Sequence, residues 1–275
     1  MTLGELVKLS TEFLAERGVA SPRLDVEFIL AHALGRGRLD LYLEHDRELG
    51  PDELDRCRAL VERRGRREPL AYVLGDWGFR ELTLRCDARA LVPRPETEVL
   101  VERALVLLGD IERPEVLDVG TGTGAVALSL VRERPGVRAT GLDLSPGALA
   151  LARENAEATG LDLELVEGDF RTGLPGGPYD LVVSNPPYVR PDEIETLEPE
   201  VRDWEPREAL VSEDGPVAVA RAALAVLGPG GALALEVGDG QAESVAAALE
   251  ELGYREVAIT PDLSGRGRIV EGRVG

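Results

Sequence analysis

The residues best suited to chemistry stand together in one short segment, Asn185-Pro186-Pro187-Tyr188, which follows the apolar stretch 181–184. That stretch predicts the end of a buried strand. Two consecutive prolines fix the backbone, have no N–H to donate, and keep the residue before each of them extended. The segment therefore offers an amide side chain, a main-chain carbonyl and an aromatic ring. Two acceptors and a ring suit a flat group that carries an NH2.

A second motif, Gly120-Thr121-Gly122-Thr123-Gly124, follows a predicted strand at 116–119 and precedes a predicted helix at 125–134. Its glycines allow a sharp turn and a close approach of the backbone to a ligand. Ala125 also completes the pattern G-x-G-x-x-A, which is typical of dinucleotide-binding folds. The glycine loop alone therefore indicates a nucleotide without deciding which one.

Two further predicted strands end in residues that fit a nucleoside. Asp143 ends the strand 137–144, about twenty residues beyond the glycine loop, where a carboxylate can accept hydrogen bonds from a ribose diol. Asp169 and Phe170 follow the strand 163–166, and they suit an exocyclic amine and the face of an adenine. Taken singly, Asp143 also fits a helix cap and Asp169 a turn. Together with the glycine loop they predict a nucleoside site.

The elements that must position these residues alternate from residue 115 onward. Apolar strands are predicted at 116–119, 137–144, 163–166, 179–184, 232–237, 257–259 and 268–271, with helices at 125–134, 146–159, about 215–227 and about 240–252. This alternation predicts an α/β fold with a mainly parallel sheet covered by helices on both faces. Ligands of such sheets bind at the carboxyl ends of the strands, which is where the candidate residues stand.

The N-terminal part, residues 1–70, predicts a small helical bundle. Thr2, the pair Ser21-Pro22 and Pro51 are typical helix starts, and 39–43 is predicted as a short turn. The bundle carries no catalytic signature, and its His32 and His45 lack the spacing of metal ligands. We expect no metal site.

Residues 71–93 predict a β-hairpin linker, and residues 94–275 a second domain. Pro69 and Gly75 interrupt the helical pattern, and 76–80 and 81–85 then alternate like the strands of a hairpin. The stiff segment 93–98 leads into a helix that is predicted to begin at Glu96 or Thr97.

Composition narrows the possible functions. The 275 residues include 51 acidic and 31 basic side chains, a net charge of −20, which argues against broad contact with a nucleic-acid backbone. The densest basic cluster, between Arg56 and Arg67, favours a solvated helix face. Cys57 and Cys86 lie far apart and predict free thiols in a reducing cytoplasm. An N-terminal export signal and a long apolar run are both absent, so we expect neither export nor a membrane span.

The segment 118–124, Asp143 and the segment 185–188 together resemble the S-adenosylmethionine-dependent methyltransferases that act on planar nitrogens. Over nearly the whole chain the sequence resembles one branch of them, the HemK/PrmC family, which methylates the glutamine N5 in the Gly-Gly-Gln loop of class I peptide-chain release factors and so modulates translation termination. The other segments that carry the resemblance are Ser21-Pro22-Arg23-Leu24-Asp25, Glu68-Pro69-Leu70-Ala71-Tyr72, Gly75 with Phe79, Pro93-Arg94-Pro95-Glu96-Thr97-Glu98 and Glu205-Pro206-Arg207-Glu208-Ala209-Leu210. In one departure, Leu91 stands where members often carry an aromatic residue.

The resemblance implies a Rossmann-like, seven-stranded, mostly parallel class I methyltransferase sheet, and an N-terminal bundle that recognises the substrate. It implies S-adenosyl-L-methionine as the methyl donor, with S-adenosyl-L-homocysteine as product. Asn185 and the Pro186 carbonyl would hold the glutamine NH2 and Tyr188 would pack on the amide plane, so these three are the expected catalytic residues, and Pro187 completes the substrate site. The expected cofactor site comprises Gly120, Thr121, Gly122, Thr123, Gly124, Asp143, Asp169, Phe170 and Asn185. We expect a monomeric cytoplasmic protein.

Three alternatives remain open. A DNA or RNA methyltransferase acting on adenine N6 fits the segment 185–188 but lacks a basic target-recognition domain. A nicotinamide-dependent dehydrogenase fits the glycine loop but leaves the segment 185–188 unexplained. A non-catalytic scaffold that keeps the fold would have no use for an intact Asn185 and Asp143.

Overall fold

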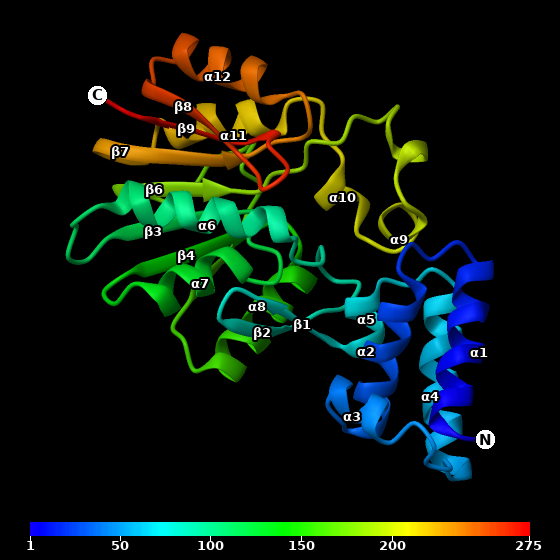
Figure 1. Ribbon diagram of the computed structural model, residues 1–275. Helices are drawn as coiled ribbons and strands as arrows, with labels where there is room; N and C mark the ends of the chain where they lie inside the picture. The colour runs from blue at the N-terminus through cyan, green and yellow to red at the C-terminus, as the bar shows by residue number, and fades with distance from the viewer. The chain divides into compact units, whose positions relative to one another are not determined.

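The computed structural model describes all residues, 1–275, and these form two compact units (Figure 1). The first unit contains residues 1–76 and the short segment 198–204. The second contains residues 77–197 and 205–275. A segment from late in the sequence therefore belongs to the N-terminal unit. None of the helices combines the length and apolar character needed to cross a membrane.

The first unit is helical, as the sequence predicts. Its helices are α1 (Leu3–Glu16), α2 (Pro22–Leu34), α3 (Arg38–Leu43), α4 (Pro51–Gly65), α5 (Leu70–Leu74) and α9 (Pro199–Arg202). Leu14, Ile29 and Leu30 are fully buried in a core shared by α1, α2 and α4. The predicted turn at 39–43 is wrong, because these residues lie in α3, where Asp40 accepts a hydrogen bond from the Gly37 N–H (2.9 Å) and caps the helix start.

The predicted helix starts are confirmed, and one of them differs in detail. Thr2 forms a reciprocal capping box with Glu5, in which the Glu5 N–H donates to Thr2 Oγ1 (3.2 Å) and the Thr2 N–H donates to Glu5 Oε2 (2.8 Å). Pro22 occupies the first position of α2, but the Ser21 side chain makes no cap. Proline therefore acts there through its fixed φ alone.

The basic cluster is only partly solvated: Arg56, Arg58 and Arg66 are exposed, whereas Arg63, Arg64 and Arg67 form ion pairs. Arg64 is buried, and its guanidinium binds Asp25 (2.7 Å) and Glu200 (2.8 Å). Arg67 binds Glu200 (2.6 Å) and Glu198 (3.2 Å). These ion pairs attach the segment 198–204 to α4, which explains why it belongs to the helical unit.

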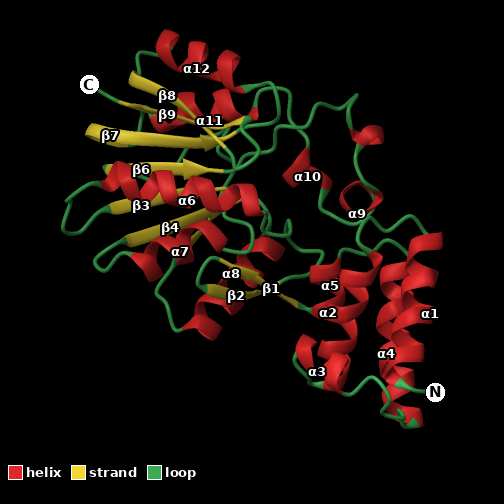
Figure 2. Ribbon diagram, in the orientation of Figure 1, coloured by secondary structure: helices red, strands yellow, loops and turns green.

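The second unit is built on a seven-stranded sheet, which confirms the predicted fold (Figure 2). Its strand order is β5-β4-β3-β6-β7-β9-β8, with the first five strands parallel and β9 antiparallel to both neighbours. The strands are β3 (Glu115–Val119), β4 (Arg138–Asp143), β5 (Glu164–Glu167), β6 (Tyr179–Ser184), β7 (Leu227–Glu236), β8 (Arg255–Pro261) and β9 (Gly267–Arg273). The predicted hairpin is also present, as β1 (Asp76–Phe79) and β2 (Leu82–Arg85).

Helices cover both faces of the sheet, because its central strands are apolar on both sides. Leu181 and Val183 face the core beneath α6 and α7, whereas Val182 faces the core beneath α11 and α12. The helices of this unit are α6 (Pro95–Leu108), α7 (Ala125–Glu133), α8 (Pro146–Thr159), α10 (Arg207–Leu210), α11 (Gly215–Ala223) and α12 (Ala242–Glu251), with a 3₁₀ turn at Ile194–Thr196. The three short elements at 194–210 were not predicted, and α6 begins at Pro95, before the predicted start.

We expect Arg64→Ala to destabilise the protein by about 3–5 kcal/mol, because Asp25 would remain buried without its partner and Glu200 would keep only Arg67. Urea unfolding of the full chain followed by circular dichroism measures this. Arg66→Ala is the matched control, since Arg66 is exposed on the same helix end and should change stability by less than about 0.5 kcal/mol. Equal effects of the two substitutions would contradict the structural role of Arg64.

Candidate active site

The register of the sheet brings the predicted site residues to one edge. Val119 of β3 pairs with Leu142 of β4 on one side and with Ser184 of β6 on the other. Asp143 pairs with Glu167 of β5. The loops that follow β3, β4, β5 and β6 thus leave the sheet side by side. The strand order reverses at β3, and such a switch point is the usual ligand crevice of an open α/β sheet.

The glycine loop folds tightly over the end of β3. Gly120, Gly122 and Gly124 have φ values of +74°, +55° and +82°, in the left-handed region that favours glycine. The Gly120 N–H donates to the Leu142 carbonyl (2.8 Å) and holds the loop against β4. A Cβ on Gly120 would lie 4.0 Å from the carbonyl oxygen of Asn185. The glycine loop and the segment 185–188 are therefore neighbours, as the sequence predicts.

A buried carboxylate that the sequence analysis included in the motif 118–124 without assigning it a role supports this loop. Asp118 Oδ2 accepts hydrogen bonds from the Thr121 hydroxyl (2.8 Å) and from the Ala127 N–H (3.3 Å) at the start of α7. Burial raises the pKa of Asp118 to about 7, although both hydrogen bonds oppose this shift. The signal in the sequence was a charged residue within the otherwise apolar stretch 116–119.

Asp143 connects three loops at the edge. Its two carboxylate oxygens accept hydrogen bonds from the Gly122 N–H (2.9 Å) and the Ser145 N–H (2.9 Å), and its carbonyl accepts one from the Gly168 N–H (3.0 Å). Burial raises the pKa of Asp143, and these backbone donors act in the opposite direction. Each carboxylate oxygen keeps a lone pair for a further donor. The arrangement fits the predicted ribose contact, which remains a prediction.

Asp169 and Phe170 lie in the loop that follows β5. Asp169 Oδ1 accepts from the Arg171 N–H (2.9 Å) and the Asp169 carbonyl accepts from the Thr172 hydroxyl (2.9 Å), so its own bonds shape a turn. The Arg171 guanidinium lies 4.5 Å from the centre of the Phe170 ring and donates to Ser212 Oγ (2.9 Å). One face of Phe170 is thus covered by Arg171. Contact of these residues with an adenine remains a prediction.

Asn185 follows directly after β6 and is held by its amide nitrogen. Asn185 Nδ2 donates to Thr97 Oγ1 (3.2 Å), and the Thr97 hydroxyl donates to Glu236 Oε2 (2.7 Å). Neither Asn185 Oδ1 nor the Pro186 carbonyl receives a hydrogen bond from within the chain. Two acceptors are therefore available beside the glycine loop. Sequence reasoning did not connect Thr97 or Glu236 with this site.

The backbone of the segment 185–188 is fixed from both sides. A Cβ on Gly215, at the start of α11, would lie only 2.0 Å from the Pro187 carbonyl oxygen, so glycine is required for this approach. The Tyr188 carbonyl accepts from Gln241 Nε2 (3.0 Å), and a Cβ on Gly238 would lie 3.1 Å from Cδ2 of the Tyr188 ring. Two other segments of the second unit thus hold the prolines and the tyrosine in place.

The electrostatics of Tyr188 limit its chemical role. Burial, and then the nearby charge of Glu236, raise the pKa of the Tyr188 phenol to about 12. The phenol therefore stays protonated near neutral pH. Tyr188 offers the site an aromatic ring and a neutral hydroxyl, and no base.

An ion pair explains two other motifs of the sequence. Arg94 Nη2 lies 2.6 Å from both carboxylate oxygens of Glu205, and the Val92 N–H donates to the same carboxylate (3.3 Å). Burial raises the pKa of Glu205, and Arg94 opposes this shift. The pair joins the segment before α6 to the segment before α10. It fixes the start of the helix that carries Thr97.

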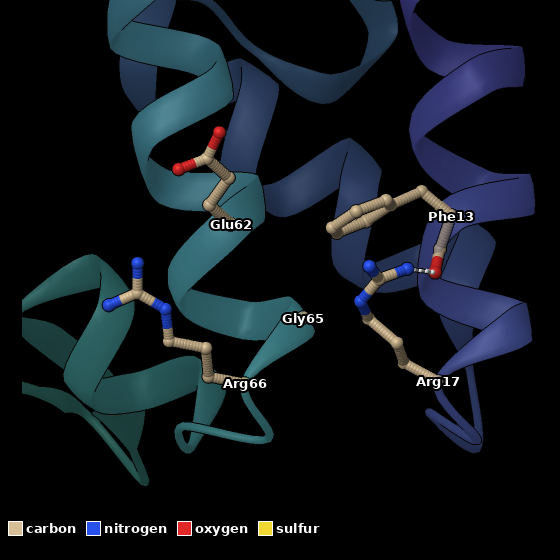
Figure 3. Close-up of a pocket in the computed structure, with 5 residues that line it drawn as sticks. All are labelled: Phe13, Arg17, Glu62, Gly65 and Arg66. Carbon is tan, nitrogen blue, oxygen red and sulfur yellow. Dashed lines mark hydrogen bonds between the residues drawn. The ribbon is translucent and has the colours of Figure 1, made fainter.

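A hollow of about 300 Å³ on the helical unit offers no comparable chemistry (Figure 3). The guanidinium of Arg17 lies 3.5 Å from the centre of the Phe13 ring and covers it. Phe13 packs so closely on Gly65 that a Cβ there would meet its ring at 2.5 Å. The remaining lining residues are Glu62 and Arg66. The hollow lies between the C-terminal ends of α1 and α4.

Comparison with known proteins decides the family. Residues 5–75 match the PrmC N-terminal domain, and residues 96–198 match the methyltransferase small domain. A release factor glutamine methyltransferase from Deinococcus radiodurans is 45% identical over 277 residues, which cover 99% of both chains. Another, from Geobacter sulfurreducens, is 41% identical over 100% of this chain and 97% of its own. This chain belongs to the release factor glutamine methyltransferase family.

Solved structures support the fold of this family member. A methyltransferase from Pyrococcus furiosus superimposes with a TM-score of 0.51 at 19% identity, covering 71% of this chain and 90% of its own. The 16S rRNA N2 G1207 methyltransferase from Thermus thermophilus gives a TM-score of 0.53 at 18% identity, covering 73% of this chain and 50% of its own. Both likenesses concern the architecture alone.

We expect Asp118→Asn to flatten the pH dependence of stability. The folded pKa of Asp118 is raised to about 7, so its contribution is present at low pH and is lost as pH rises through 7. An asparagine oxygen can accept from both present donors without this titration. Wild type should therefore lose about 2–3 kcal/mol more than the variant between pH 5 and pH 8 in urea unfolding. Asp180→Asn, at a partly exposed carboxylate on β6, is the matched control and should behave as wild type.

Proposed function

We propose that this protein transfers a methyl group from S-adenosyl-L-methionine to the side-chain nitrogen N5 of the glutamine in the Gly-Gly-Gln motif of peptide-chain release factors, and so modulates translation termination. Full-length relatives with this named activity support the proposal. The single structural observation that carries it is the pair of available acceptors, Asn185 Oδ1 and the Pro186 carbonyl, beside the glycine loop.

The residues at the edge fit the methyl donor. Gly120 brings no side chain between the two loops, and Asp143 keeps acceptor capacity for a ribose diol. Asp169 and Phe170, on the adjacent loop, are assigned to the adenine. S-adenosyl-L-methionine supplies an activated methyl group on its sulfonium, and S-adenosyl-L-homocysteine is the product. Thr121, Thr123 and Asn185 complete the proposed cofactor site.

The chemistry explains why two acceptors are needed. The nitrogen of a carboxamide is a poor nucleophile because its lone pair is delocalised into the carbonyl. Asn185 Oδ1 and the Pro186 carbonyl would accept its two hydrogens, which raises the electron density on nitrogen and fixes its orientation. Tyr188 would pack on the amide plane, and Pro187 completes the substrate site. Orientation is the main catalytic contribution in this proposal, and no strong base is required because the proton can leave after transfer.

The helical unit is assigned to recognition of the release factor. It matches the PrmC N-terminal domain, and its two histidines, His32 and His45, form no metal site with neighbouring acids. We infer a cytoplasmic location from the proposed substrate, since release factors act in translation. We propose that the enzyme acts as a monomer without direct contact with nucleic acid.

An adenine amine is the alternative substrate, because its NH2 would fit the same two acceptors. The net charge of −20 disfavours a nucleic acid. Incubation with labelled S-adenosyl-L-methionine and either release factor, DNA or RNA separates the two. We expect label only on the release factor, as one methyl on the Gly-Gly-Gln peptide by mass spectrometry. Label on DNA or RNA alone would refute the proposed substrate.

We expect Asn185→Ala to reduce turnover by roughly 100-fold or more while the affinity for S-adenosyl-L-methionine changes little. The substitution removes one of the two acceptors but leaves the glycine loop and Asp143 in place. Single-turnover methylation of intact release factor measures the first effect, and calorimetric titration with the methyl donor measures the second. Full activity in the variant would show that Asn185 does not hold the substrate.

A further inference from the structure

Glu236 is a buried carboxylate to which the proposed mechanism so far assigns no part. It is 1% exposed at the end of β7, one residue beyond Leu235, which pairs with Ser184. Asn185 stands one residue beyond Ser184, so the two side chains leave neighbouring strands at the same level. The helix α6 packs against both β6 and β7, and Thr97 lies in its first turn. The hydroxyl of Thr97 bridges Glu236 and Asn185.

The direction of these hydrogen bonds follows from the chemistry of the groups. An ionised carboxylate only accepts hydrogen bonds, so Thr97 must donate its single hydroxyl proton to Glu236 (2.7 Å). Thr97 Oγ1 is then left with lone pairs, and it accepts from the NH2 of Asn185 (3.2 Å). The side-chain oxygen of Asn185 must consequently lie on the other side of the amide, away from Thr97.

We propose that Glu236, acting through Thr97, fixes the side-chain amide of Asn185 in the orientation that presents an acceptor to the substrate NH2. This inference rests on the proposed function and makes Thr97 and Glu236 positioning residues. Without the carboxylate, Thr97 can donate to Asn185 instead. The amide of Asn185 is then free to turn, and it would present its own NH2 to the NH2 of the substrate.

The surroundings make this arrangement sensitive to pH. The groups that face Glu236 are Thr97, Arg268 of β9, Tyr188, and Glu96 and Arg94 at the start of α6. Burial raises the pKa of Glu236 to about 7, with Glu96 acting in the same direction and Thr97 and both arginines opposing it. A carboxyl in this range loses its charge, and with it the fixed direction of the bonds, in mildly acidic solution.

Matched substitutions separate positioning from packing. Thr97→Val keeps the shape but removes the hydroxyl, and we expect kcat to fall roughly 10- to 100-fold with intact release factor. Thr97→Ser keeps the hydroxyl and should stay within about threefold of wild type. Thr140→Val is the control, because it removes a buried hydroxyl that bonds Tyr179 on another strand, and it should leave kcat unchanged. Affinity for S-adenosyl-L-methionine should be similar in all four proteins, whereas Thr97→Val should melt at a lower temperature than Thr97→Ser because the buried Glu236 loses its hydroxyl donor.

The pH profile supplies a readout that a packing defect does not change. In wild type, kcat should rise through a step near pH 7 as Glu236 ionises. Glu236→Gln should remove this step, because glutamine does not titrate. Burial also raises the pKa of Asp118 to about 7, so the step belongs to Glu236 only if Glu236→Gln, with Asp118 intact, abolishes it.

A measurement without substrate keeps the two proposals apart. The side-chain NH2 signals of Asn185, assigned by their loss in Asn185→Ala, should shift near pH 7 in ¹H–¹⁵N spectra of wild type and stay constant in Glu236→Gln. Three outcomes would each overturn the proposal that Glu236 fixes the amide of Asn185 through Thr97. They are constant Asn185 signals in wild type, a pH step that Glu236→Gln retains, and full activity of Thr97→Val. If wild type methylates no release factor, the proposed function fails, and the Asn185 signals alone then decide whether Glu236 fixes the amide.

Discussion

The parallel pairing of β3 with β6 is the constraint on which the site depends. It sets Val119 opposite Ser184, and the Ser184 hydroxyl donates to the Val119 carbonyl (2.6 Å). The glycine loop and the segment 185–188 therefore begin at the same level of the sheet. A shift of one residue would move every apolar side chain of β6 to the opposite face. Both faces of this strand pack in apolar cores, so such a shift would force both cores to repack, and their close packing therefore fixes the register that brings the two loops together.

The edge of the sheet holds several carboxylates in an environment that disfavours their charge. Burial raises the pKa of Asp118, Asp143 and Glu236, so each reduces stability at neutral pH. Each also holds the position of another element: Asp118 the glycine loop, Asp143 the three neighbouring loops, and Glu236 the hydroxyl of Thr97. Asp180, which also bonds a backbone N–H, is only partly buried and lies at the opposite, N-terminal end of β6. At the candidate site, the buried carboxylates are therefore the groups that hold the neighbouring loops and side chains in position.

Much of the architecture could be predicted from local patterns. The apolar runs gave the strands, and prolines and glycines marked the ends of the helices, because each of these signals acts over a few residues. The short helix α3 was mistaken for a turn, since six residues show too little periodicity to separate the two. The elements at 194–210 escaped prediction for the same reason.

Partners far apart in the sequence could not be predicted. Thr97 and Glu236 are separated by 139 residues, and Arg94 and Glu205 by 111. Neither pair shows a spacing that local rules recognise, because the fold alone brings them together. The sequence nevertheless shows a charged residue within two of the apolar strands, namely Asp118 and Glu236. Such residues mark sites where an unpaired charge would be costly, so a partner elsewhere in the chain can be expected even when it cannot be named.

The structure also indicates where substrate selectivity must arise. Two acceptors and an aromatic ring distinguish an NH2 from a hydroxyl or a carboxylate, but they treat a carboxamide and an adenine amine alike. In the proposed mechanism, Asn185, Pro186 and Tyr188 therefore define the reacting group without defining the molecule that carries it. The strong negative charge disfavours nucleic acid over the whole surface. The remaining selection for a protein substrate must depend on surfaces beyond the site, and the helical unit, which supplies none of the residues assigned to the chemistry, is the part of the chain available for it.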